Sequence, residues 1–136
     1  LKRYSEDMRG DLAYPFLLFR QSDHALLGGL TLTNIRRGVA QSGSLGYWIG
    51  APFAHQGYMT RAVSALVPFA FEGLRLHRIE AACLPDNLAS RRVLTKAGFV
   101  EEGVARKYLK INGKWRDHVL FAILEDDVSS LRTQKG

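Results

Sequence analysis

Short runs of hydrophobic residues, separated by turn-forming residues, occupy the first third of the chain and predict β-strands. Residues 14–20 form an aromatic and aliphatic run, and residues 25–35 form a second strand-like run after a polar turn. Together the two runs predict a hairpin. Within the second run, Gly28 and Gly29 predict a bulge or a close approach of another backbone, because glycine weakens a regular strand without adding a side chain to pack.

The spacing of the apolar residues becomes helical after a third strand, which is predicted at residues 45–50. From residue 58 to residue 72, apolar side chains recur every three or four positions, and Gly73 follows as a stop signal. Pro68 lies inside this helix. It predicts a bend there, because proline has no backbone N–H to donate.

A fourth strand and a second helix follow along the chain. Residues 78–83 form a short apolar strand that ends at a proline turn. The second helix is predicted over residues 87–97, because Asn87 can cap its start and Gly98 can end it. Residues 99–102 continue in an extended conformation.

The last part of the chain predicts a second hairpin. Residues 108–111 and 115–124 flank Asn112-Gly113, which is the strongest short signal for a two-residue hairpin turn. Within the final strand, Trp115 and Phe121 are expected to lie in the core.

The predicted elements form one continuous domain. The sequence contains no internal repeat, low-complexity tract or linker, so strands and two helices predict a single α+β (α/β) domain over residues 1–136. Residues 1–11 have the composition of the end of a charged helix, with no capping residue ahead of Leu1. We therefore expect the beginning of this first element to be missing from the chain.

Composition narrows the class of protein. The chain has 136 residues, of which 46% are hydrophobic, and no apolar run approaches the roughly 18 to 20 residues that a membrane-spanning helix requires. The mixed charges of the first residues do not form a secretory signal, so we expect a cytoplasmic protein. The single cysteine, Cys83, excludes an internal disulfide and is interpreted as a buried, inert thiol. The four histidines lack metal-ligand spacing, and no bound metal is expected.

The positive charge indicates an anionic partner without choosing one. Nineteen lysines and arginines against thirteen acidic residues give a net charge of +6. A nucleic acid, a ribosomal surface and a polyphosphate cofactor all fit this charge, as does a basic surface that only keeps the protein in solution. Direct nucleic-acid binding is not expected, because the charge is dispersed and no stretch interleaves basic with aromatic residues.

Two segments carry candidate chemistry. In the first, a strand, a polar turn ending at Gly57 and a helix starting at Tyr58 can bind a phosphate, because the first backbone N–H groups of a helix have no internal partners. A glycine before a helix is common, however, so a purely structural role stays open. In the second segment, Asn87 and Ser90 are three residues apart and share one helix face. Alone, they also fit a helix cap and an exposed serine.

A series of short motifs runs through nearly the whole chain in a specific order. They are LLGGLTL at residues 26–32, GYWIG at 46–50, QGYMT at 56–60, LHRIEA at 76–81, NLAS at 87–90, KAGF at 96–99 and LKING at 109–113. Together they resemble the GNAT acetyltransferases, and within these the RimJ/RimL-like ribosomal-protein alanine N-acetyltransferases. Each motif is unspecific, and the combination is specific.

The resemblance implies a fold and an activity. The implied fold is a mixed, mostly antiparallel, twisted sheet of about six strands with flanking helices, whose first strand and helix would precede Leu1. The implied activity is acetyl-CoA-dependent transfer of an acetyl group to a primary amine, in particular the N-terminal α-amine of a ribosomal protein. A small-molecule amine acetyltransferase and a non-catalytic acyl-CoA-binding module remain as alternatives. Neither a membrane nor a metal is implied, and a homodimer stays open.

The resemblance also implies the residues that bind acetyl-CoA. Backbone N–H groups of the turn before the first helix would hold the pyrophosphate, and His55 stands where the family usually has the first of two glycines. Trp48 and Ile49 would pair with the amides of the pantetheine arm, and Asn87 would hydrogen-bond the same arm. The residues of this turn are His55, Gln56, Gly57, Tyr58, Met59 and Thr60.

Amide formation requires three chemical functions. The amine must lose a proton, the oxyanion must be stabilised and the leaving thiolate must be protonated. By similarity to the family, Ser90 is the candidate proton donor to the sulfur and also contacts the cofactor. Glu80 is the candidate base, acting through water, and pairing of Glu80 with an arginine is an equal alternative. The main-chain N–H of Ile49 or Gly50 is the candidate oxyanion donor.

Overall fold

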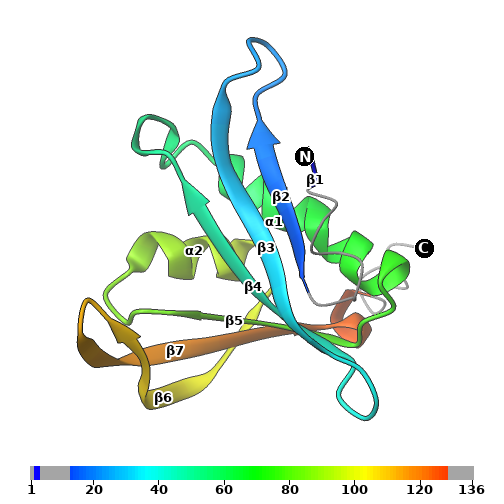
Figure 1. The fold of residues 1–136 in the computed structure, drawn as a ribbon, viewed down its shortest axis with the longest axis vertical. Helices are drawn as coiled ribbons and strands as arrows, with labels where there is room; N and C mark the ends of the chain where they lie inside the picture. Colours follow the sequence, from blue (N-terminus) through cyan, green and yellow to red (C-terminus); the bar gives the residue numbers. More distant parts are fainter. Residues whose placement is uncertain (1, 4–12, 129–136) are drawn as a thin grey trace.

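The computed structural model describes residues 2–3 and 13–128, and a seven-stranded sheet organises them (Figure 1). The strand order is β1-β2-β3-β4-β5-β7-β6, and every neighbouring pair is antiparallel except β4 with β5. The mixed, mostly antiparallel sheet predicted from the sequence is therefore confirmed. The strands are β1 (Lys2–Arg3), β2 (Tyr14–Phe19), β3 (Leu26–Arg36), β4 (Ser42–Ile49), β5 (Arg78–Cys83), β6 (Val100–Ile111) and β7 (Lys114–Leu124).

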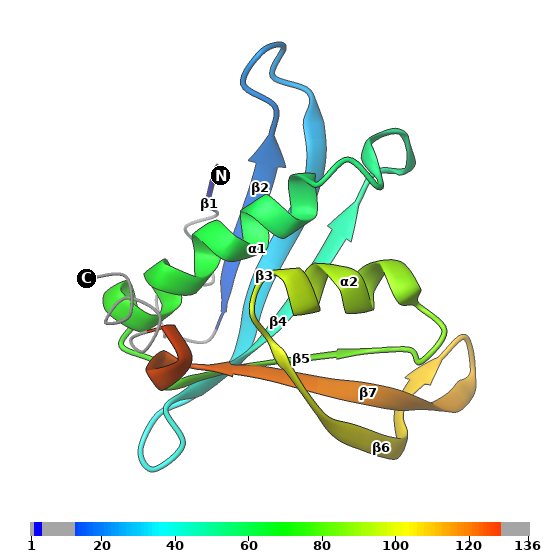
Figure 2. The ribbon, with the colours of Figure 1, turned by 180° about the vertical axis from the view of Figure 1, so that it is seen from behind.

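Two helices cover one face of the sheet (Figure 2). These are α1 (Tyr58–Pro68) and α2 (Leu88–Lys96), and a short 3₁₀ turn, η1 (Ala51–Phe53), follows β4. The core lies between this helical layer and the sheet. Its fully buried side chains include Leu30 and Leu32 of β3, Val63 and Leu66 of α1, and Leu94 of α2.

The irregularity predicted at Pro68 occurs there. The α-helix ends at Pro68 and passes into a π-helical turn, η2 (Phe69–Gly73), in which the N–H of Leu74 donates to the carbonyl of Phe69. A proline cannot donate the regular helical hydrogen bond, and the wider π turn satisfies the carbonyls that follow. No helix in the described part of the chain is long and apolar enough to cross a membrane.

Three sequence predictions need correction. Lys2–Arg3 pair with β2 as a strand instead of ending a helix, and the rest of residues 1–11 lies outside the described residues. Two extended pieces were expected after α2, yet residues 100–111 form one strand with two register shifts. Trp115 is 59% exposed, whereas Phe121 is buried as predicted. Trp115 is exposed because residues 114–118 of β7 pair only with β6, beyond the reach of β5.

The parallel pairing of β4 with β5 is short. Residues 42–45 of β4 lie beside residues 78–81 of β5, and the two strands then diverge, as Figure 1 shows. On its other edge, β4 stays paired with β3 as far as Ile49. One edge of β4 is therefore left without a strand partner over residues 46–49.

The glycine pair of β3 permits this arrangement. A Cβ atom at Gly28 would lie 2.2 Å from the carbonyl oxygen of Trp48, and a Cβ atom at Gly29 would lie 2.7 Å from the Trp48 indole nitrogen. The predicted close approach of another backbone is thus confirmed at Gly28, where no side chain can be accommodated.

We predict that Gly28→Ala lowers the free energy of unfolding by about 1–3 kcal/mol, because the added methyl group meets a backbone atom that cannot rotate away. Gly46→Ala is the matched control, since a Cβ atom at Gly46 meets nothing within 4 Å. The control should leave stability unchanged or slightly increased. Denaturant unfolding followed by circular dichroism compares the two, and equal stabilities would contradict the close approach.

Candidate functional site

Two cavities adjoin the point where β4 leaves β5. The first has a volume of about 470 Å³, and lies between the second half of β4, the turn before α1, and α2. The second, of about 340 Å³, is lined entirely by strands, on the face away from the helices. Residues 44–46 of β4 line the second cavity, and residues 47–49 line the first. The two cavities thus share one continuous stretch of backbone.

The first cavity brings together most of the predicted cofactor residues. It also includes several side chains that the sequence interpretation did not name, among them Tyr47, Arg92 and Lys96. Gln56 and Glu80 do not line it. The predicted residues that do line it are Trp48, Ile49, His55, Gly57, Tyr58, Met59, Thr60, Asn87 and Ser90.

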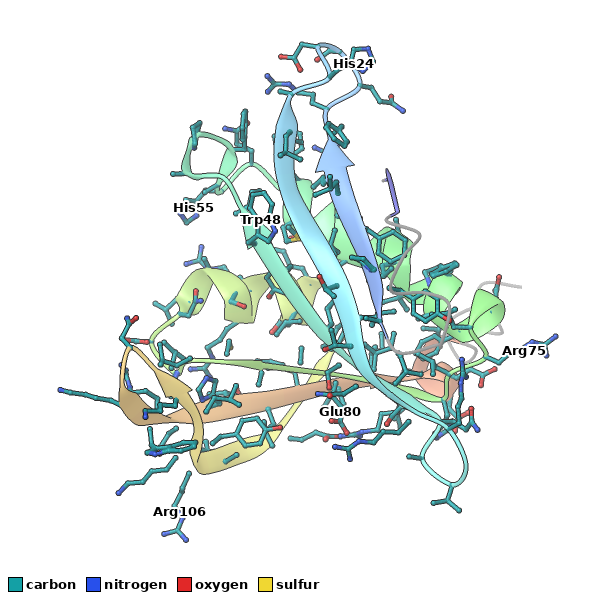
Figure 3. All side chains as sticks on the ribbon, viewed as in Figure 1. His24, Trp48, His55, Arg75, Glu80 and Arg106 are labelled. Atoms are coloured by element: carbon teal, nitrogen blue, oxygen red, sulfur yellow. The ribbon has the colours of Figure 1, made fainter. Side chains whose placement is uncertain are left out.

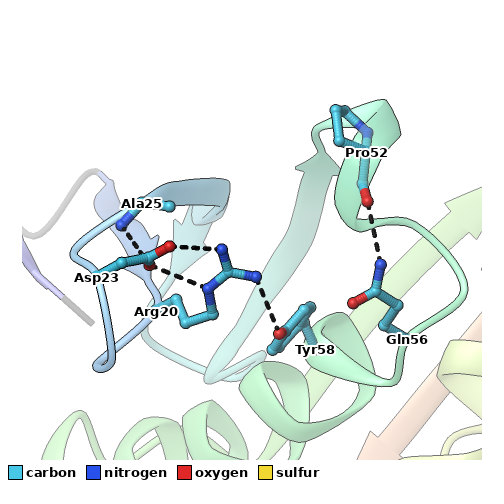
Figure 4. Close-up of polar contacts among 6 residues, drawn as sticks. All are labelled: Arg20, Asp23, Ala25, Pro52, Gln56 and Tyr58. Atoms are coloured by element: carbon cyan, nitrogen blue, oxygen red, sulfur yellow. Dashed lines mark hydrogen bonds and ion pairs between the residues drawn. The ribbon is translucent and has the colours of Figure 1, made fainter.

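The turn before α1 has two residues in the left-handed region. Gly57 has a φ of 80°, and His55, at the position where glycine was expected, has a φ of 62°. A side chain in this region costs roughly 1–2 kcal/mol, which explains why glycine suits the position. The Gln56 amide donates a hydrogen bond of 3.0 Å to the carbonyl of Pro52, so its side chain braces the turn from outside the cavity (Figure 4).

The start of α1 is available to an anion. Its N-cap residue is Gly57, and no side chain caps the first turn. The free N–H groups and the positive end of the helix dipole face this end of the cavity. Arg20 stabilises the same turn from the β2–β3 hairpin by donating to the Tyr58 hydroxyl, 3.4 Å away (Figure 4). Arg20 also pairs with Asp23 and lowers the pKa of that carboxyl to about 2.

The open edge of β4 presents the backbone of Ile49. The N–H of Gly50 donates a hydrogen bond of 2.7 Å to the carbonyl of Leu27. It is therefore not free to act as the oxyanion donor, a role that the sequence analysis assigned to Ile49 or Gly50. Because successive N–H groups of a strand point to opposite edges, the N–H of Ile49 points toward the gap left by β5. The carbonyl of Trp48 faces Gly28 of β3 instead. Of the two predicted residues, only Ile49 directs its backbone to the cavity.

Ser90 forms a hydroxyl pair with Tyr47. The two hydroxyl oxygens are 2.6 Å apart, and the Tyr47 hydroxyl also lies 3.2 Å from the Ser90 carbonyl. Burial raises the pKa of Tyr47, and the hydrogen bond to Ser90 opposes this shift. The phenol is therefore protonated at neutral pH and can donate. The sequence interpretation missed Tyr47, although alternation along β4 puts it on the same face as Leu45 and Ile49, toward the helices.

Asn87 caps α2, as its position predicts. Its side-chain oxygen accepts a hydrogen bond of 3.1 Å from the N–H of Ser90, which fixes the first turn of the helix. The amide nitrogen of Asn87 carries two further donors. Cys83 is buried as predicted, and burial raises the pKa of its thiol.

Glu80 lies in the second cavity, away from His55 and Trp48 (Figure 3). Its carboxylate accepts from the Arg78 Nε atom at 2.9 Å, so the ion pair considered for Glu80 is present. Arg78 also pairs with Glu102 through both terminal nitrogens, and lowers the pKa of Glu102. Within residues 2–3 and 13–128, no group of three or more histidine, cysteine or acidic side chains is placed to hold a metal ion.

A family model described as an acetyltransferase (GNAT) domain matches residues 1–100. The chain belongs to the GNAT acetyltransferase family. It is 46% identical to the probable N-acetyltransferase YjcK of Bacillus subtilis over 127 residues, which cover 93% of the chain and 70% of that protein. It is 36% identical to the [ribosomal protein uS5]-alanine N-acetyltransferase of Escherichia coli over 115 residues, which cover 85% of the chain and 59% of that protein.

A solved GNAT structure shares the fold. Mycobacterium smegmatis RimJ in complex with CoA-disulfide has a TM-score of 0.83 and 37% identity, covering 88% of this chain and 56% of that one. The chain therefore spans between 56 and 70% of the length of these three relatives. The predicted family and its RimJ-like relatives are confirmed.

We predict that Tyr47→Phe lowers the free energy of unfolding of this GNAT domain by about 0.5–1.5 kcal/mol, because it removes the hydrogen bonds to Ser90. Tyr108→Phe is the control, since Tyr108 is 47% exposed and its ring contact with His118 does not use the hydroxyl. Chemical denaturation measures both variants. If Tyr47→Phe is as stable as the control, the hydroxyl pair does not form in solution.

Proposed function

We propose that the chain is an acetyl-CoA-dependent N-acetyltransferase that modifies a primary amine, with a protein N-terminal α-amine, such as that of a ribosomal protein, as the acceptor. The observation that carries this proposal is the pair of cavities that adjoin at the divergence of β4 from β5. Such a pair lets two reactants approach one reaction centre from opposite faces of the sheet. The RimJ complex with CoA-disulfide supports the choice of cofactor.

The residues of the first cavity fit acetyl-CoA. An uncapped helix start at Gly57 suits a pyrophosphate, which is bound well by free N–H groups. The unpaired backbone of Ile49 suits a chain that contains amide groups, because it offers a donor and an acceptor as a β-strand would. The amide nitrogen of Asn87 adds donors along the same path.

The acetyl transfer then requires one backbone N–H group and a few side chains. Acetyl-CoA supplies a thioester carbonyl, on which the amine nitrogen forms its new bond while the carbon–sulfur bond breaks. The Ile49 N–H is placed to stabilise the oxyanion. The Ser90 hydroxyl gives its proton to the departing thiolate, and the Tyr47 hydroxyl hydrogen-bonds to Ser90 and can restore that proton. Glu80 lines the second cavity while Arg78 holds its Oε1 atom, and in this proposal the ion-paired carboxylate receives the proton of the amine through water.

The acceptor enters through the second cavity in this proposal. The E. coli relative acts, by its name, on an alanine of ribosomal protein uS5, and this supports a protein N-terminus as the substrate. A small, uncharged N-terminal residue suits a cavity of about 340 Å³ that is lined mainly by small and apolar strand residues around one Arg78–Glu80 ion pair.

We predict that Ser90→Ala lowers kcat by about 10²- to 10⁴-fold, because the leaving thiolate loses its proton donor. Calorimetric affinity for acetyl-CoA should change little. Thr95→Ala on the same helix is the control, since the Thr95 hydroxyl only bonds back to the Arg91 carbonyl. Thiol release measures turnover with ribosomal-protein N-terminal peptides as acceptors.

The same assay separates the alternatives. Mass spectrometry that finds acetyl groups on small amines, and on no N-terminal peptide, would replace the proposed acceptor with a small molecule. Calorimetric binding of acetyl-CoA without thiol release on any amine would identify a non-catalytic acyl-CoA-binding module. If Ser90→Ala turns over as fast as Thr95→Ala, Ser90 is not the proton donor.

A further inference from the structure

Arg92 and Lys96 form an unpaired basic pair at the edge of the first cavity. They lie one helical turn apart on α2, and both line the cavity. No aspartate or glutamate among the described residues lines it with them. Neither side chain has an ion-pair partner in the part of the chain that the structure describes.

The neighbouring Arg91, unlike Arg92 and Lys96, has structural partners. Arg91 pairs with Glu101 at 2.8 Å and donates to the carbonyl of Pro85 at 3.0 Å. At 3.6 residues per turn, Arg92 and Lys96 are about 40° apart around the helix, and Arg91 is about 100° away from Arg92. The helix therefore directs one paired arginine away from the cavity and two unpaired cations toward it.

Two like charges at this spacing repel each other. In isolated helices such pairs are destabilising by about 0.2–0.5 kcal/mol, and a bound anion between them would remove this repulsion. The helix C-terminus accounts for Lys96, which lies in the last turn, but not for Arg92 in the middle of α2. No carboxylate within the described residues neutralises either of them, and the cavity is the space they share.

The position of the pair on α2 separates it from the reacting end. Arg92 and Lys96 are about 160° and 120° around the helix axis from Ser90. The opposite wall of the cavity is the turn from His55 to the start of α1, which offers its own N–H groups. The pair therefore lines a part of the cavity that is separate both from Ser90 and from the turn before α1.

We propose that Arg92 and Lys96 form a subsite for a phosphate monoester, the 3′-phosphate on the ribose of CoA. This inference rests on the proposed function. The pyrophosphate is assigned to the turn, and the monoester is the remaining anion of the cofactor, with nearly two negative charges at neutral pH. Guanidinium and ammonium groups bind such a phosphate by charge-assisted hydrogen bonds. The subsite distinguishes CoA from 3′-dephospho-CoA.

Calorimetric titration with CoA and with 3′-dephospho-CoA tests the subsite. We expect the unmodified chain to bind CoA at least about tenfold more tightly than 3′-dephospho-CoA. In Arg92→Gln/Lys96→Gln the two ligands should bind equally, because glutamine keeps the helix propensity and removes the charge. Arg91→Gln is the matched control, and it should keep the preference of the unmodified chain.

Each other outcome overturns a specific claim. Equal binding of both ligands by the unmodified chain would remove the subsite while leaving the proposed function intact. No binding of either ligand would remove the proposed function and the subsite with it. A double variant that loses affinity for both ligands by the same factor, or an Arg91→Gln variant that also loses the preference, would show that the pair acts through general charge alone.

Discussion

The parallel contact between β4 and β5 ends after four residue pairs, from Ser42 with Arg78 to Leu45 with Ala81. If β5 continued beside β4, its backbone would take up the N–H of Ile49 and close the space between the two cavities. Because β5 departs, both faces of the sheet reach the same stretch of β4. The two cavities, the open edge and the placement of Ser90 above it all depend on this divergence.

Because one edge of β4 is open, its position depends on the pairing of its other edge with β3. The β3–β4 pairing runs from Gly28 to Arg36, and the carbonyl of Trp48 approaches so close to Gly28 that only glycine fits. The indole of Trp48 also lies over Gly29. The glycine pair thus positions the backbone on which Tyr47 and Ile49 are carried.

The basic side chains of the chain differ in whether they form ion pairs, which the net charge does not show. Arg20, Arg78 and Arg91 are each paired with carboxylates, and the pairs Arg78–Glu102 and Arg91–Glu101 join separate segments. Arg78 pairs with two glutamates, Glu80 on the same strand and Glu102 on β6, and Glu80 is the candidate base. Among the residues that the structure describes, Arg92 and Lys96 line the first cavity without an ion-pair partner.

The sequence by itself determined the order of strands and helices from residue 14 onward, the turn at Gly57, the cap at Asn87 and the family, because each depends on local spacing or on a run of motifs. Only the tertiary structure decided which side chains and backbone groups of the site contact one another. The Tyr47–Ser90 contact joins residues 43 positions apart, and the Gly50 N–H is taken by Leu27. Glu80 faces the second cavity because a strand alternates its side chains. Such contacts depend on register and divergence between strands, which local patterns do not encode.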